Sequence, residues 1–277
     1  MSKGCSVSAV CRLMHRSRQS YYKILNSKAQ RSSDQAALQN LVQPVRHLMP
    51  RVGGKKLYAM IQPTMSKKRL KIGRDRFFKW LKHNDLLVSP KKQYVNTTQS
   101  HHRFWIYDNL TTTVNLTQSN QLWVSDITYL RTMEGFCYLA LITDAYSRKI
   151  VGFDVSDSLE LDGCVRALKS ALQTASNLGQ LIHHSDRGIQ YCSNQYTALL
   201  KQRGIKISMA AKGNCYENAL AERVNGILKG EFNLDTKFKT KQQAIQAVQQ
   251  SVYIYNSHRP HWSLKLRTPE AVHETIN

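Results

Sequence analysis

Three acidic residues, Asp126, Asp186 and Glu222, occupy sequence contexts in which a carboxylate is unexpected. Asp126 interrupts an apolar, strand-like run, Asp186 follows another such run, and Glu222 lies within a helix-like stretch. An isolated carboxylate in or beside a core strand is unfavourable unless its charge is compensated. Two carboxylates about 4 Å apart repel each other by roughly 4 kcal/mol at an effective dielectric near 20. A divalent cation removes this repulsion, and Mg²⁺ prefers such oxygen ligands. The three acids are therefore predicted to bind a divalent metal ion.

The order and spacing of these acids agree with a known pattern. In the chain, 35 residues lie between Asp186 and Glu222, and the set resembles the DDE triad of retroviral integrases and related transposases. The flanking segments resemble transposases of bacterial insertion sequence three elements over about residues 5–272. The motifs that carry this resemblance are His184-Ser185-Asp186-Arg187-Gly188-Ile189-Gln190-Tyr191, the segment 212–222, and Tyr255-Asn256-Ser257-His258-Arg259-Pro260-His261, followed by Leu264 and Thr268-Pro269.

Two positions depart from the pattern of that family. Such sequences usually carry Asp where this chain has Glu217, and often Ser where it has Arg223. Glu217 is a competing third acid, but only 30 residues separate it from Asp186. Glu222 has the family spacing and is the predicted third ligand.

The resemblance implies a fold, a reaction and a cofactor. The expected fold is α/β: an RNase H-like integrase core with a five-stranded mixed sheet and helices, preceded by an all-α helix-turn-helix region. The expected reaction is metal-dependent DNA strand cleavage and strand transfer at the ends of an insertion sequence. Two Mg²⁺ ions, with Mn²⁺ as a substitute, are implied at the three acids. The chain resembles a second reading-frame product, which related elements often fuse to an upstream product.

Composition agrees with a nucleic-acid partner. The 277 residues carry a formal net charge of +22, which favours a polyanion such as DNA, here the terminal inverted repeats and the target. An apolar run long enough for a membrane span is not found, and the N-terminus lacks a secretory pattern. The six cysteines form no Cys-x-x-Cys pair, so free thiols and a bacterial cytoplasmic, nucleoid-associated location are expected.

Hydrophobic periodicity divides the chain into five segments. Three consecutive strands joined by short turns are expected in the fourth segment, at residues 121–130, 136–143 and 150–155. A helix at 161–174 and two more strands interleaved with helices should follow. The fifth is expected to hold a helix from about residue 241 to 255. The predicted segments are an N-terminal helix-turn-helix (1–30) capped by Ser6 or Ser8, a second helical DNA-binding unit (34–88), a basic linker (89–118), the catalytic core (119–232), and a C-terminal helix with a basic aromatic tail (233–277).

Several basic and amide residues are candidates for DNA contact. Asn218, Glu222, Asn225 and Lys229 fall on one face of a helix, which would place amides and a lysine beside a metal ligand. Ordinary surface positions are the alternative for the basic residues, and a strap packed on the catalytic domain is the alternative for the tail. The predicted DNA-contact residues are Arg16, Arg18, Lys55, Lys56, Arg187, Lys212, Asn218, Asn225, Lys229, His258 and Arg259.

Two other functions are compatible with part of this pattern. A phage or retroviral-type integrase shares the triad, but a His/Cys zinc-binding spacing is not found in the sequence, and the flanking motifs are of the bacterial type. A DNA-binding regulator with an inert core would not require all three acids. Assembly into a homo-oligomer on DNA is expected.

Overall fold

The computed structural model describes residues 6–89, 104–175, 178–211 and 218–275. The chain divides into two compact units, one formed by residues 1–48 and 53–87, the other by residues 49–52 and 88–277. Among the described residues, no helix combines the length and apolar character needed to cross a membrane. Each unit is considered separately.

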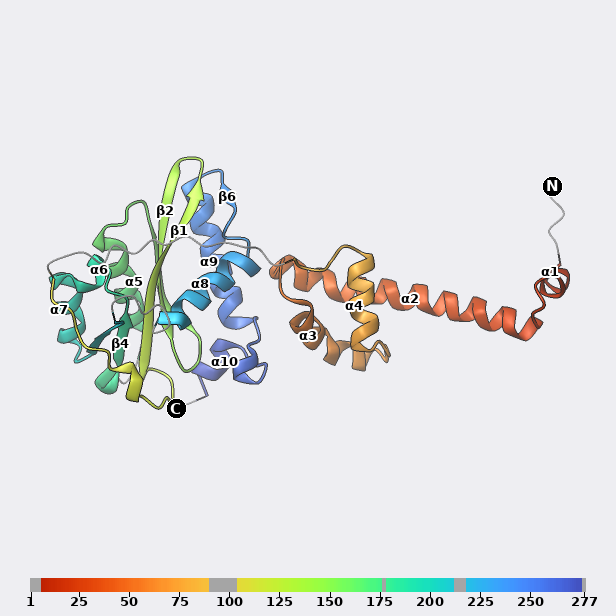
Figure 1. The fold of residues 1–277 in the computed structure, drawn as a ribbon, viewed down its shortest axis with the longest axis horizontal. Coiled ribbons are helices and arrows are strands. Elements are labelled where there is room, and N and C mark those ends of the chain that lie inside the picture. Colours follow the sequence, from red (N-terminus) through yellow and green to blue (C-terminus); the bar gives the residue numbers. More distant parts are fainter. Residues whose placement is uncertain (1–5, 90–103, 176–177, 212–217, 276–277) are drawn as a thin grey trace. The chain divides into compact units, whose positions relative to one another are not determined.

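The first unit is all-α, as expected. Figure 1 shows its elements, among them a long helix, α2. The helices are α1 (Val7–Leu13), α2 (Arg18–Leu48), α3 (Gly54–Lys67) and α4 (Arg74–His83).

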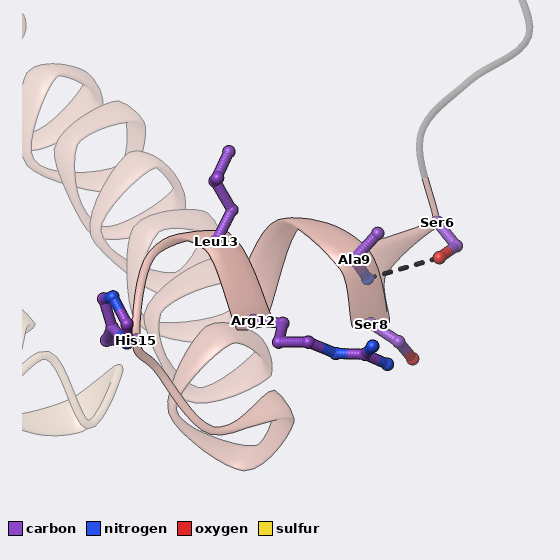
Figure 2. Close-up of a pocket in the computed structure, with 6 residues that line it drawn as sticks. All are labelled: Ser6, Ser8, Ala9, Arg12, Leu13 and His15. Atoms are coloured by element: carbon purple, nitrogen blue, oxygen red, sulfur yellow. Dashed lines mark hydrogen bonds between the residues drawn. The ribbon is translucent and has the colours of Figure 1, made fainter.

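The predicted turn between the first two helices is present. Ser6 caps α1 by accepting a hydrogen bond from the backbone N–H of Ala9, and His15 takes a positive φ of 50° in the turn. The Ser6 cap is visible in Figure 2, where Arg12 and His15 line a small pocket beside the same helix. A helix-turn-helix therefore begins the described chain.

The predicted break between residues 30 and 34 is wrong. α2 runs without interruption through this stretch for 31 residues, a length of about 46 Å at 1.5 Å per residue. The stretch holds no Gly or Pro, and the Gln30 amide donates to Asp34 one turn later, at 2.9 Å. Local side-chain interactions of this kind stabilise a continuous helix. The two helical segments predicted on either side are one element.

The C-terminal half of α2 packs against α3 and α4, and α1 also contacts α2. Leu38 and Val42 are buried in α2, whereas Tyr22, Ile24 and Leu25 are exposed. The core that Leu38 and Val42 join is completed by α3 and α4 through Leu57, Ile61, Met65, Phe77, Trp80 and Leu81.

The second unit is built on one mixed sheet. Its strand order is β3-β2-β1-β4-β5, with β1, β2 and β3 antiparallel and β1, β4 and β5 parallel, while β6 also pairs with β1. This arrangement confirms the predicted RNase H-like order of a three-stranded meander followed by two interleaved strands. The strands are β1 (Leu122–Thr132), β2 (Gly135–Asp144), β3 (Ile150–Ser156), β4 (Ile182–Ser185), β5 (Lys206–Met209) and β6 (Lys237–Phe238).

Helices cover both faces of this sheet (Figure 1). One face packs on α5 through a core that includes Trp123, Ile142, Leu168 and Tyr196. On the other face Leu122 and Val124 meet Ala221 of α8. The helices are α5 (Leu161–Thr174), α6 (Ile189–Cys192), α7 (Asn194–Gln202), α8 (Ala219–Glu231), α9 (Lys241–Ser257) and α10 (Pro269–His273).

The close approach of α5 to β3 depends on one glycine. A Cβ added at Gly152 would lie 2.3 Å from the backbone carbonyl oxygen of Ala167. Since real Cβ atoms do not approach so closely, no larger residue fits without displacing α5.

The predicted linker is shorter than residues 89–118. Residues 90–103 lie outside the described residues, but Leu110, Val114 and Leu116 pack on the sheet core. Leu110 also donates its N–H to the Ser208 hydroxyl at 2.8 Å. The apolar residues in this polar segment therefore belong to the catalytic unit.

Candidate active site

Parallel pairing of β1 with β4 brings the first two acids together. Ser125 of β1 and Ser185 of β4 are register partners, so the residues that follow them, Asp126 and Asp186, lie side by side. Asp126 is in the middle of β1, and Asp186 comes directly after β4. Both side chains are half-buried.

Backbone and amide groups hold these two carboxylates. The Asn225 amide of α8 donates to Asp126 Oδ2 at 2.7 Å. The backbone N–H of Gly188 donates to Asp186 Oδ1 at 3.0 Å. Both contacts fix the direction of a carboxylate that would otherwise rotate.

Two amides of α8 attach this helix to β1. Asn218 donates to the carbonyl oxygen of Ser125 at 3.2 Å, and Asn225 donates to Asp126. The two residues are only 4% and 6% exposed. The prediction that they contact DNA is therefore wrong. The helical face that carries them was identified from the sequence, but at these two positions it packs on the strand instead of facing solvent.

The environment of Asp126 makes its charge unfavourable. Burial, and after it the negative charge of Asp186, raises the pKa of Asp126 to about 7, while the Asn225 hydrogen bond opposes the rise. The charge of Glu222 adds a smaller increase. Both other acids thus disfavour the negative charge of Asp126, and a cation beside it would reverse the effect.

The donor chemistry of the three carboxylates suits a hard divalent cation, although their side chains are not gathered around one point. Glu222 lies in the first turn of α8 and is exposed, so its carboxylate is available to a ligand. Within the described ranges, no three acidic, histidine or cysteine side chains are close enough to enclose one ion. The donor set of Asp126, Asp186 and Glu222 consists only of carboxylate oxygens, which suits Mg²⁺ or Mn²⁺. Glu217 lies outside the described residues.

The adjacent histidines next to Asp186 are structural. His183 Nε2 lies 2.7 Å from the Ser125 hydroxyl and 2.9 Å from the Tyr196 hydroxyl, and burial lowers its pKa to about 3. His184 Nδ1 lies 2.9 Å from the Ser208 hydroxyl. Both rings are buried and bonded within the core.

The predicted basic contacts differ in exposure. Arg16, Arg18, Lys55 and His258 are exposed, Lys56, Arg187 and Lys229 are half-buried, and Lys212 lies outside the described residues. Arg187 donates to the carbonyl oxygen of Ala210 at 2.7 Å.

The prediction that Arg259 contacts DNA is wrong. Its side chain is 1% exposed and donates through Nε and Nη2 to both carboxylate oxygens of Glu231, each at 2.8 Å. His261 Nε2 lies 2.7 Å from its Nη1. The tail is a strap packed on the catalytic unit at these residues, whereas Tyr253 and Trp262 remain exposed. A mixture of basic and aromatic residues has the same sequence pattern in both settings.

Lys229 and its surroundings complete the site. Its ammonium lies 4.4 Å from the ring centroid of Tyr129 on β1. Burial lowers the pKa of Lys229, while the negative charge of Asp126 acts in the opposite direction. Lys229 therefore lies near the carboxylates, as its helical spacing predicted.

The sequence matches two profiles of the integrase core domain, at residues 117–215 and 203–269. An insertion element IS600 protein of 31 kDa from Shigella sonnei is 37% identical over 216 residues, covering 77% of this chain and 79% of that protein. The transposase InsF of insertion sequence IS3A from Escherichia coli is 45% identical over 112 residues, covering 40% and 39% of the two chains.

The chain is also similar to a further transposase sequence and to a solved integrase structure. The putative transposase of IS986/IS6110 from Mycobacterium tuberculosis is 43% identical over 118 residues, covering 41% of this chain and 42% of that protein. Among solved structures, the HTLV-2 integrase catalytic core domain in complex with magnesium has 17% identity and a TM-score of 0.45, covering 57% of this chain and 98% of that one. This chain therefore aligns with about two fifths of the length of InsF and of the IS986/IS6110 transposase.

Proposed function

Because the chain belongs to the family of insertion-sequence transposases with an integrase core domain, we propose that it cleaves and joins DNA strands at the ends of its element. Asp126, Asp186 and Glu222 are the proposed catalytic and metal-binding residues. The relatives named as transposases support this reading over that of a retroviral or phage integrase.

One observation carries the proposal. The register of β1 with β4 places Asp126 next to Asp186, in an environment that disfavours the negative charge of Asp126. A divalent cation bound by the two carboxylates would stabilise both negative charges.

Proteins with this core use divalent metal ions. When bound, two ions supply activation of the attacking water or 3′-hydroxyl and stabilisation of the leaving 3′-oxygen. Asp126, directed by Asn225, and Asp186, directed by the Gly188 N–H, would hold them from the sheet, with Glu222 closing the site from α8. His183 and His184 are engaged within the core, so neither is proposed to move a proton.

DNA is the proposed partner of both units. The exposed Arg16 and Arg18 follow the turn of the N-terminal helix-turn-helix, and Lys55 lies exposed in the first turn of α3. These positions are proposed to contact the terminal repeats, and Lys229 to contact phosphate near the scissile bond. Assembly of several copies on DNA, with or without an upstream reading-frame product, is part of the same proposal.

The test uses a labelled oligonucleotide that carries the end of the element, with Mg²⁺ or Mn²⁺. We expect metal-dependent nicking and joining by the native chain and by Glu274→Gln, a control on an exposed acid, and its loss in Asp126→Asn, Asp186→Asn and Glu222→Gln. We also expect Mg²⁺ to raise the melting temperature of the native chain but not that of Asp126→Asn. Cleavage that survives Asp186→Asn would refute the proposed site, and binding without any cleavage would favour an inert regulator.

A further inference from the structure

The hairpin formed by β1 and β2 has one buried face and one aromatic face. Cys137 and Leu139 of β2 and Leu130 of β1 are buried on one side. On the opposite side, Phe136 is 53% exposed and Tyr138 is half-buried. Since side chains alternate along a strand, the exposed aromatic residues all lie on the face that α5 covers farther along the sheet.

Helix α5 covers only part of this face. Ala140 and Ile142 of β2 belong to the core beneath α5. α5 begins near Ser156, where an added Cβ at Gly163 would clash with the Ser156 hydroxyl, and Ser156 is the register partner of Tyr138. The hairpin continues past this level to its tip (Figure 1). Among the described helices and strands, none packs over the aromatic face beyond Tyr138, where Phe136 is 53% exposed.

The aromatic residues form a contiguous surface across two strands. Tyr129 of β1 is the register partner of Tyr138, and Arg131 is the partner of Phe136. The rings of Tyr129 and Phe136 meet edge to face, with centroids 5.6 Å apart. We call Tyr129, Arg131, Phe136 and Tyr138 the hairpin platform.

The platform and Asp126 lie on opposite faces of β1, because side chains alternate along a strand, and the two faces meet at an open sheet edge. On the side of β1 away from β2, β4 pairs only with residues 122–125, and β6 only with Arg131 and Thr132. Among the described strands, none pairs with residues 126–130 on that side. Asp126 lies at one end of this gap and Tyr129 near the other, about 10 Å apart at 3.3 Å per residue. Lys229 reaches into the gap from α8 and lies over the Tyr129 ring.

Charge indicates the kind of ligand. Arg131, Lys237 and Lys239 are exposed around the tip of the hairpin, and Lys229 is half-buried at its base. Asp157 at this end of the sheet forms an ion pair with Lys241, and Glu134 accepts a hydrogen bond from the Lys241 backbone N–H. Aromatic rings surrounded by basic side chains suit unpaired nucleotides, whose bases stack while their phosphates meet the basic groups.

We propose that the hairpin platform binds unpaired nucleotides of DNA that pass the open edge of β1 on their way from the catalytic acids. This inference deepens the proposed function, because strand cleavage at an element end requires access to one strand of a duplex. Stacking on Phe136, the exposed ring of the platform, would hold the bases that separate there. Stacking tolerates any base, so the platform is expected to act without sequence preference.

The test compares binding to a forked duplex and to the same duplex fully paired, both of generic sequence, in Ca²⁺ and at fixed salt. The unpaired arm carries 2-aminopurine, whose fluorescence falls on stacking. We expect Phe136→Ala to weaken binding to the fork about tenfold and to abolish the quenching, with no change on the paired duplex. Phe136→Trp should restore both. Tyr253→Ala, which removes a ring from α9 that is 62% exposed against 53% for Phe136, is the matched control and should behave as the native chain does.

Two results would overturn the inference. One is equal binding of the fork by Phe136→Ala and Tyr253→Ala. The other is equal loss on fork and paired duplex, which would indicate a general backbone contact. Because the DNA is generic and the metal does not support cleavage, this result is independent of the triad test. If the chain quenches 2-aminopurine in the fork but cleaves no element end, the hairpin platform is supported and the proposed function is refuted.

Discussion

Arg259 offers a direct test of the structure against its sequence pattern. The side chain is 1% exposed, and its two hydrogen bonds to Glu231 join the C-terminal strap to the last residue of α8. Removal of one partner of a buried ion pair costs about 3–5 kcal/mol because the other charge is left uncompensated. The Glu231 side chain is 20% exposed and keeps some hydration, so the lower limit, about 3 kcal/mol, applies to Arg259→Ala.

This free energy converts into a measurable shift in melting temperature. The unit of residues 49–52 and 88–277 lies in the size range where 1 kcal/mol corresponds to about 2–4 °C. We therefore expect Arg259→Ala to lower the melting temperature of this unit by about 6–12 °C, measured by circular dichroism. Arg259→Lys should recover only part of the loss, because an ammonium cannot form the two parallel hydrogen bonds.

The neighbouring exposed residue provides the control. His258→Ala should leave the melting temperature unchanged. In a double-mutant cycle, adding Glu231→Gln to Arg259→Ala should destabilise the unit by much less than the single changes predict together. The reasoning is refuted if Arg259→Ala melts within 2 °C of the native chain, about the shift of a surface substitution, and instead loses DNA affinity.

Three further predictions concern the core of the catalytic unit. Asn225→Ala should reduce the rate of end cleavage at least about tenfold and lower the free energy of unfolding by about 1.5–3 kcal/mol, because Asp126 loses a hydrogen bond to a charged group; unchanged cleavage and stability would contradict this role. Burial lowers the pKa of His183 to about 3 in the folded chain, whereas the pKa in the unfolded chain is about 6.5. Between these values only the unfolded chain takes up the proton, so the free energy of unfolding decreases as the pH is lowered below about 6.5. Urea unfolding at pH 7.5 and 5.0 should show that His183→Gln removes about 2 kcal/mol of this loss, and an identical pH dependence in the variant would argue against it. Gly152→Ala should destabilise the unit by more than about 1–3 kcal/mol because the new Cβ meets a backbone oxygen of α5 at 2.3 Å. Gly226→Ala, with open space around it in α8, should instead stabilise the unit by about 0.5–1 kcal/mol. Thermal unfolding that gave both changes the same sign would contradict the packing argument.

Much of the catalytic unit was predictable from local sequence. The strands were expected at 121–130, 136–143 and 150–155, and the structure has β1, β2 and β3 at nearly these bounds. The helix expected at 161–174 is α5. These elements alternate or repeat with a clear period, and local period is what a sequence records directly. The types and order of the three acids were likewise sufficient to indicate a metal site.

Other features depended on partners far away in the chain. Glycine and proline are absent between residues 30 and 34, yet composition alone did not reveal one continuous α2. Leu110 and Val114 were hidden in a polar segment, because their burial requires a sheet made of later residues. β6, which pairs with the end of β1, was not predicted from its two residues.

The same distinction applies to individual site residues. The sequence determined which side chains carry charge, amide and aromatic groups, and it determined that Asn225 and Lys229 share a helical face with Glu222. Only the tertiary structure decided that Asn225 is turned onto Asp126, that Arg259 is buried on Glu231, and that Phe136 remains exposed at an uncovered sheet face. The physical reason is that chemical type and period are properties of the chain, whereas burial depends on which distant element packs against a face.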